Sequence, residues 1–133
     1  LGELPIYPAV NALDNAITVT STMLDGRLAE GSNFGKAVDI GLPAENLLTI
    51  GVNAHQRMMS GSSFAVPKLT AYVICISNAA TPNRLTGEAL AQAVKTSLLP
   101  AASGAGYGLF LSDSKLDTTC KPYRQDTKTK VKD

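Results

Sequence analysis

The chain contains no tryptophan, one histidine and two cysteines among 133 residues, and only 5% of its residues are aromatic. A core with so few aromatic side chains must be aliphatic and modest in size, although a hydrophobic content of 44% is enough to build one. Two cysteines do not make a disulfide framework. The length fits a single domain.

Long apolar runs and an excess of charge are also missing. No run approaches the ~20 apolar residues of a membrane span, and the N-terminus lacks the charged and apolar regions of a signal peptide. The formal net charge of +1 creates no global basic field that would attract nucleic acid. We therefore expect a cytosolic product without a membrane partner, in which any nucleic-acid surface is local.

The scarcity of histidine limits the chemistry. A serine or cysteine nucleophile paired with histidine would have to use His55, and nothing in the sequence places a nucleophile beside it. One histidine and two distant cysteines lack the spacing of a metal site. The glycines from Gly104 to Gly108 lack the Gly-Lys-Ser/Thr ending of a phosphate loop and indicate a flexible turn. The sequence therefore predicts no enzyme, no metal and no cofactor.

Alternation of apolar and polar residues predicts antiparallel strands in the first half of the chain. Strands are expected at 17–20, 36–42 and 48–57, with a hairpin turn at Asp25-Gly26 and a weak return strand at 27–30. The strand at 48–57 alternates most regularly, so one of its faces is expected to be covered and the other solvated.

The segment 68–103 predicts one β-branched strand, 69–77, followed by one amphipathic helix, 85–99. Thr86 is the expected N-cap, and Pro100 ends the helix. A sheet with a single helix cannot cover itself, so we expect an obligate dimer. Its interface is expected at the apolar stripe of the helix, which consists of Leu90, Val94 and Leu98.

The two cysteines lie in different surroundings. Cys75 falls inside an apolar segment and is expected to be a small buried hydrophobe. Cys120 falls in a polar C-terminal tail, where it is either a free thiol or part of a disulfide between subunits. Residues 115–133 carry six Lys/Arg and three Asp, a net charge of +3. We therefore divide the chain into a sheet-and-helix domain, 1–112, and a basic tail, 113–133, mobile or ordered only against a neighbour.

One face of the strand at 48–57 is polar at every second residue. Its side chains offer hydroxyl, amide, imidazole and guanidinium groups, which can hydrogen-bond phosphates and base edges, and His55 or Tyr72 could stack on a base. The candidate RNA-binding residues are Thr49, Asn53, His55, Arg57 and Tyr72. An ordinary solvated sheet face is the alternative.

Three stretches, at 12–20, 69–74 and 85–90, follow one another in an order that resembles the coat proteins of single-stranded RNA bacteriophages. The likeness covers residues 12–112 and rests on the pattern of elements. It implies an α+β fold, in which an antiparallel β-sheet has an N-terminal hairpin and a C-terminal helix that packs on the partner subunit of a dimer.

The resemblance also implies a function. In such a capsid protein, dimers of the chain close an icosahedral shell around single-stranded RNA, and the inward sheet face with Thr49, Asn53, His55 and Arg57 grips an RNA hairpin. The expected location is the virion, assembled in the cytoplasm of a host bacterium. The expected partners are the chain itself and single-stranded RNA.

Two other classes of function stay open from the sequence. The chain could be another self-assembling subunit, of a phage tail or a pilus-like fibre, that binds no nucleic acid. It could also be a small enzyme centred on Cys75 or His55. The polar strand face favours the coat protein over the first alternative, and the lack of paired catalytic residues disfavours the second.

Overall fold

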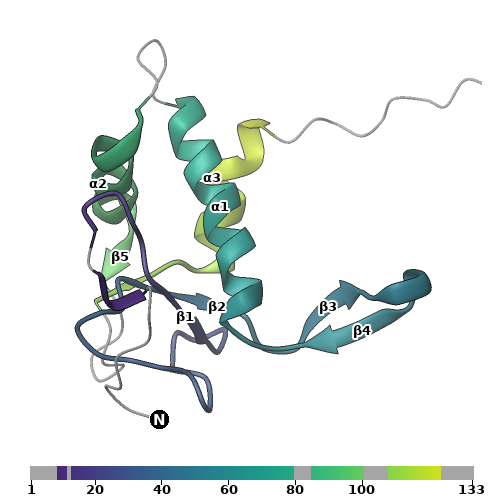
Figure 1. Cartoon of the computed structure of the whole chain (residues 1–133). Helices are drawn as coiled ribbons and strands as arrows, with labels where there is room; N and C mark the ends of the chain where they lie inside the picture. The colour runs from purple at the N-terminus through teal and green to yellow at the C-terminus, as the bar shows by residue number, and fades with distance from the viewer. Residues whose placement is uncertain (1–8, 12, 80–84, 101–107, 124–133) are drawn as a thin grey trace, which may run out of the picture.

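The computed structural model describes residues 9–11, 13–79, 85–100 and 108–123 (Figure 1). The turn predicted from Gly104 to Gly108 and the C-terminal half of the basic tail fall largely outside these residues. The strands are β1 (Val19–Thr22), β2 (Ile40–Pro43), β3 (Leu47–Ile50), β4 (Gln56–Met59), β5 (Leu99–Pro100) and β6 (Leu109–Phe110). The helices are α1 (Ser62–Ala79), α2 (Gly87–Ser97) and α3 (Asp113–Cys120), and short 3-10 turns occupy Ala9–Asn11, Val52–Ala54 and Lys121–Tyr123.

The main sheet is mixed, whereas the sequence predicted an antiparallel one. Its strand order is β1-β2-β6-β5, with β1 parallel to β2, β2 parallel to β6, and β5 antiparallel to β6. Parallel neighbours need long crossover connections. Between β2 and β6 the connection includes α1, which the sequence did not predict, and α2, which it did.

Strands β3 and β4 form a separate hairpin that projects from the body of the molecule (Figure 1). The sequence predicted one continuous strand at 48–57, and this prediction is wrong, because the chain reverses at 51–55. Asn53 and Ala54 both have a φ of 59° there, in the left-handed region that tight turns use. The hairpin strands are antiparallel, and Thr49 lies opposite Arg57.

The turn predicted at Asp25-Gly26 is confirmed, with Gly26 at a φ of 85°. The Nε atom of Arg27 donates to Oδ2 of Asp25 at 2.7 Å, and this side-chain hydrogen bond lowers the pKa of the exposed Asp25 carboxyl. The return strand expected at 27–30 is reduced to a single bridge between Thr22 and Leu28.

Helix α1 lies against the sheet, and α2 and α3 pack beside it (Figure 1). The strand predicted at 69–77 is therefore wrong, since these residues are helical from Ser62 to Ala79. The buried residues recur at spacings of four, three and three, which is a helical period: Ala65, Leu69, Tyr72 and Cys75. The β-branched residues that favoured a strand lie outside this buried set: Ile74 is 54% exposed, and Val73 and Ile76 are only partly buried. Burial of the other residues against the sheet and helices outweighs their local preference for a strand.

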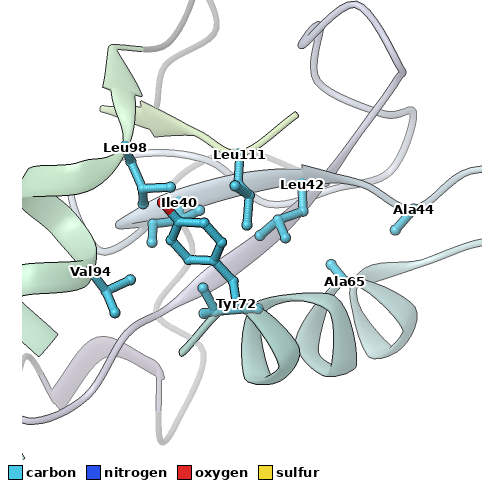
Figure 2. Close-up of a cluster of buried hydrophobic side chains, with 9 residues drawn as sticks. Ile40, Leu42, Ala44, Ala65, Tyr72, Val94, Leu98 and Leu111 are labelled. Atoms are coloured by element: carbon cyan, nitrogen blue, oxygen red, sulfur yellow. The ribbon is translucent and has the colours of Figure 1, made fainter. Parts of the chain in front are cut away.

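The core forms where α1 meets β2 and α2. Figure 2 shows Tyr72 of α1 pointing toward Ile40 and Leu42, with Val94 of α2 and Leu98, which follows α2, close by. Tyr72 is fully buried, and its hydroxyl is 3.0 Å from Oγ of Ser97. It therefore cannot stack on an RNA base as the sequence analysis expected.

The one helix that the sequence predicted, at 85–99, is confirmed at Gly87–Ser97, with Thr86 at the N-cap position although its side chain makes no capping hydrogen bond. Val94 and Leu98 are buried within the core of this same chain, and Leu90 packs against that core. Covering the apolar stripe therefore does not require a second subunit, and self-association through it stays a prediction. None of the described helices is long and apolar enough to cross a membrane.

The cysteines form one disulfide within the chain, between Cys75 of α1 and Cys120 of α3, with the Cα atoms 5.3 Å apart. Cys75 is buried as expected, but it is disulfide-bonded and not a simple buried hydrophobe, and the expectation of a free or intersubunit Cys120 is wrong. The sequence suggested neither a second helix for Cys75 to lie on nor a folded start of the tail. Residues 113–120 are helical and pack on α1.

Replacing both cysteines by alanine should lower the free energy of unfolding, because the disulfide closes a loop with a sequence separation of 45 residues. The expected loss is about 2–4 kcal/mol, measured by urea denaturation. The unmodified chain treated with a reductant serves as the control and should match the double variant. Equal stability of the oxidised and reduced chains would contradict a structural role.

Val94→Asp should unfold the isolated chain, because it places a carboxylate among buried apolar side chains. A loss of at least about 3 kcal/mol is expected from burying an unpaired charge. The exposed Val52→Asp, at 79% relative accessibility, is the matched control and should change stability little. Circular dichroism during thermal melting measures both.

Candidate active site

A sharp strand-to-helix turn carries two adjacent serines. Strand β4 ends at Met59, Gly61 adopts a φ of 128°, and α1 begins at Ser62. The backbone N–H of Gly61 donates to the carbonyl of Ala44 at 2.9 Å, and that of Phe64 donates to the carbonyl of Gly61 at 2.9 Å. The turn is thereby attached to the end of β2 and closed on itself.

Both serine side chains are exposed, and neither hydroxyl is hydrogen-bonded to any other residue that the structure describes. The helix that carries them is anchored close by, since Ala65 is fully buried in the core. The serines are therefore held on a fixed scaffold while their hydroxyl groups stay accessible.

The electrostatics of the turn favour negative charge. The first N–H groups of a helix have no acceptor within the helix, and the helix dipole adds partial positive charge at this end. Ser62 and Ser63 occupy these first positions in a helix of 18 residues. Backbone N–H groups so placed can stabilise an oxyanion that develops during acyl transfer.

A cavity of ≈ 650 Å³ opens beside the turn and is lined in part by Ser62, Ser63 and Val66. A second, smaller cavity of ≈ 290 Å³ shares Ser62 and carries the carboxylates Glu30 and Glu45. Oε1 of Glu45 accepts a hydrogen bond of 2.7 Å from the buried Ser21 hydroxyl, which fixes this carboxylate. Space for a ligand therefore exists on the side of the turn where the serines are exposed.

The histidine that could activate a serine is not at this site. His55 is the one histidine in the sequence. It lies at the far end of the projecting hairpin, where its backbone N–H donates to the carbonyl of Val52. The extended strand β4 (Gln56–Met59) separates it from the serine turn, a length of roughly 13 Å at about 3.3 Å per residue.

The predicted RNA-binding residues do not form a single polar face. Thr49 lies across from Arg57 and its hydroxyl donates to the Arg57 carbonyl at 3.0 Å. Asn53 and His55 are exposed at the tip of the hairpin, and Tyr72 is buried in the core. Among the described residues no group of three or more His, Cys, Asp or Glu could hold a metal ion.

The sequence did not indicate the serine turn, because it predicted a strand at 69–77 and no helix before it. One signal could have revealed it. The apolar segment that follows Gly61 runs for far more residues than a typical strand, which favours a helix beginning at the serines. A glycine before exposed serines at a helix start is then a candidate nucleophile turn.

An exposed serine on a tight strand-to-helix turn is an arrangement that serine hydrolases use to present a nucleophile. The comparison with protein families agrees with this class. The model of the subtilase family matches residues 6–128, nearly the whole chain, and the chain therefore belongs to the subtilase family.

Curated relatives have corresponding names. The chain is 31% identical over 104 residues to a subtilase-type proteinase of the sexual differentiation process, isp6, from Schizosaccharomyces pombe, and the match covers 74% of this chain. It is 30% identical over 94 residues to a subtilisin-like protease from Coccidioides posadasii, covering 68% of this chain. The chain spans 22% of the length of each relative.

These findings correct the functional expectations drawn from the sequence. The identification as an RNA-phage coat protein is wrong, and so are the capsid function and the location in a virion. The alternative of a tail or pilus subunit has no support, and membership in a family of proteases contradicts the expectation of a non-enzymatic protein. The resemblance failed physically because its key strand, 69–74, is part of α1.

Gly61→Ala should disturb the serine turn through the backbone alone. The added Cβ would meet no atom within 4 Å, but the φ of 128° is one that side-chain-bearing residues rarely adopt. A cost of about 1–3 kcal/mol is expected, measured by urea denaturation. Gly108→Ala also meets no atom within 4 Å and lacks a positive φ, so this control should lose little. Equal losses would refute strain at Gly61.

Proposed function

We propose that this chain carries the nucleophile of a subtilase-type serine protease and that Ser63 is the attacking residue. The observation that carries the proposal is the exposed pair Ser62-Ser63 in the first turn of α1, beside a cavity. Membership in the subtilase family supports the reaction class.

The assignment of Ser63 over Ser62 rests on their positions. Ser62 directly follows the strained Gly61 and lines both cavities, whereas Ser63 lines the larger cavity and not the smaller one. The larger cavity has the room to admit a segment of polypeptide. Attack by the Ser63 hydroxyl oxygen on a peptide carbonyl would place the resulting oxyanion near the free N–H groups at the start of α1.

The proposal requires a base from outside this sequence. A serine nucleophile of this kind loses its proton to a histidine that a carboxylate orients, and His55 lies at the other end of a hairpin strand. In subtilisin the acid and the histidine precede the serine in the chain. We infer that the histidine and carboxylate are supplied by a further segment of the protease, in agreement with the small share of its relatives that this chain spans.

The disulfide bears on where such a protease works. Disulfides form and persist in oxidising surroundings and are rare in the reducing cytosol. The pair Cys75–Cys120 joins two helices of the core. We therefore propose that the protease acts in an oxidising compartment, where this link is retained.

The test uses the complete gene product and a fluorophosphonate probe, which labels activated serines. Ser63→Ala should abolish labelling and lower peptide hydrolysis by a factor on the order of 10³–10⁶, because the nucleophile is removed. Ser62→Ala is the matched control, a hydroxyl deletion one residue away, and should keep labelling. Circular dichroism should show both variants folded.

Each outcome bears on the assignment. Loss of labelling in Ser62→Ala alone would move the nucleophile to Ser62. Labelling and hydrolysis that survive in both variants would refute a nucleophile in this turn. An unmodified protein that neither labels nor hydrolyses any peptide would refute the protease function.

A further inference from the structure

The serine turn is weakly held by its own helix. Pro67 lies inside α1, and a proline has no N–H to donate to the carbonyl four residues earlier, which here belongs to Ser63. Its ring also crowds that carbonyl. The first turn of α1 therefore lacks one of the hydrogen bonds that would tie Ser63 to the rest of the helix.

Two hydrogen bonds to the sheet flank this weakened segment instead. On one side of the serines, the N–H of Gly61 donates to the carbonyl of Ala44 at 2.9 Å. On the other side, Nζ of Lys68 donates to the carbonyl of Pro43 at 2.7 Å. Pro43 and Ala44 are adjacent residues at the buried end of β2. The segment with Ser62 and Ser63 is thus fixed at both ends to one rigid point of the sheet.

Lys68 is itself fixed by α3. Its Nζ is also 2.7 Å from Oδ1 of Asp113, the first residue of that helix, and the Lys68 side chain is only 20% exposed. The Ser112 hydroxyl caps α3 by accepting from the N–H of Lys115. The far end of α3 is joined to α1 by the disulfide at Cys120. Helix α3 is therefore fixed at both ends, and this holds Asp113 in place.

We propose that Lys68 is a positioning residue for the nucleophile turn. It does not touch substrate; its bonds to Pro43 and Asp113 hold the start of α1 so that Ser63 faces the cavity with a defined orientation. The inference rests on the proposed role of Ser63, but its first test needs no hydrolysis.

That test measures the backbone of the 133-residue chain by NMR. Lys68→Met removes the donor and the charge while keeping the apolar part of the side chain, Lys68→Arg keeps both, and Asp113→Asn keeps the bond to Pro43. Arg27→Met is the control, because Arg27 makes an ion pair of the same length with Asp25, at 2.7 Å, away from the cavity that Ser62 and Ser63 line. The readouts are the amide shifts of Ser62 and Ser63 and the hydrogen exchange of the Gly61 amide.

In Lys68→Met the Ser62 and Ser63 amides should shift and the Gly61 amide should exchange about tenfold faster, because local opening of the turn becomes easier. Lys68→Arg should restore most of both signals, and Asp113→Asn should change them less. Arg27→Met should leave them unchanged, even if it lowers the melting temperature. A Lys68→Met chain whose serine-turn signals match the unmodified chain would overturn the inference, whatever its melting temperature.

The complete gene product supplies a second readout. Lys68→Met should lower kcat about tenfold or more with KM changed less than about twofold, because small misplacements of a reacting group reduce the rate of chemistry. Lys68→Arg should recover most of this loss. Shifted serine amides without any hydrolysis in the unmodified protein would leave the positioning role standing and reject the protease function. A KM rise with unchanged kcat would instead overturn the positioning role.

Discussion

The packing of α1 against β2 is the interaction on which the rest of this structure depends. Tyr72 and Leu69 of the helix meet Ile40 and Leu42 of the strand in one buried cluster. Since the end of β2 also accepts the hydrogen bonds that hold the serine turn, the same contact that forms the core sets the position of the candidate nucleophile. Stability and function are therefore coupled through a single helix–strand interface.

The sequence predicted local features well wherever short-range chemistry decides them. The turn at Asp25-Gly26 and the helix after Thr86 are both present. The strand predicted at 69–77 failed because its β-branched residues favour a strand by local preference, while the helix is stabilised by burial of Leu69, Tyr72 and Cys75 against elements far away in the chain. Alternation at 48–57 likewise could not distinguish one strand from two strands joined by a left-handed turn at Asn53.

The candidate site was less predictable than the fold, because the groups that hold the serine turn, at Pro43, Ala44 and Asp113, are distant from it in sequence. Nothing in the sequence distinguishes Ser63 from other serines. It becomes a candidate nucleophile only once the structure shows that it lies in the first turn of a helix, directly after the turn at Gly61. His55 was a candidate because it is the one histidine in the sequence, but it lies at the tip of the hairpin, away from the serines. The disulfide between Cys75 and Cys120 depends on a third helix that the polar composition of the tail concealed.

A helix that presents a nucleophile has two conflicting requirements. The N–H groups of Ser62 and Ser63 must stay free to stabilise an oxyanion, so the turn is closed by the next N–H, that of Phe64, which donates to the Gly61 carbonyl. Pro67 removes one further hydrogen bond, because it has no N–H to donate to the Ser63 carbonyl. The rest of the fastening comes from bonds to the sheet, in which the Lys68 side chain and the Gly61 N–H donate to the adjacent carbonyls of Pro43 and Ala44 at the end of β2. The link from Lys68 through Asp113 to the disulfide-bound helix α3 explains why a short and polar C-terminal segment is folded onto the helix that carries the serines.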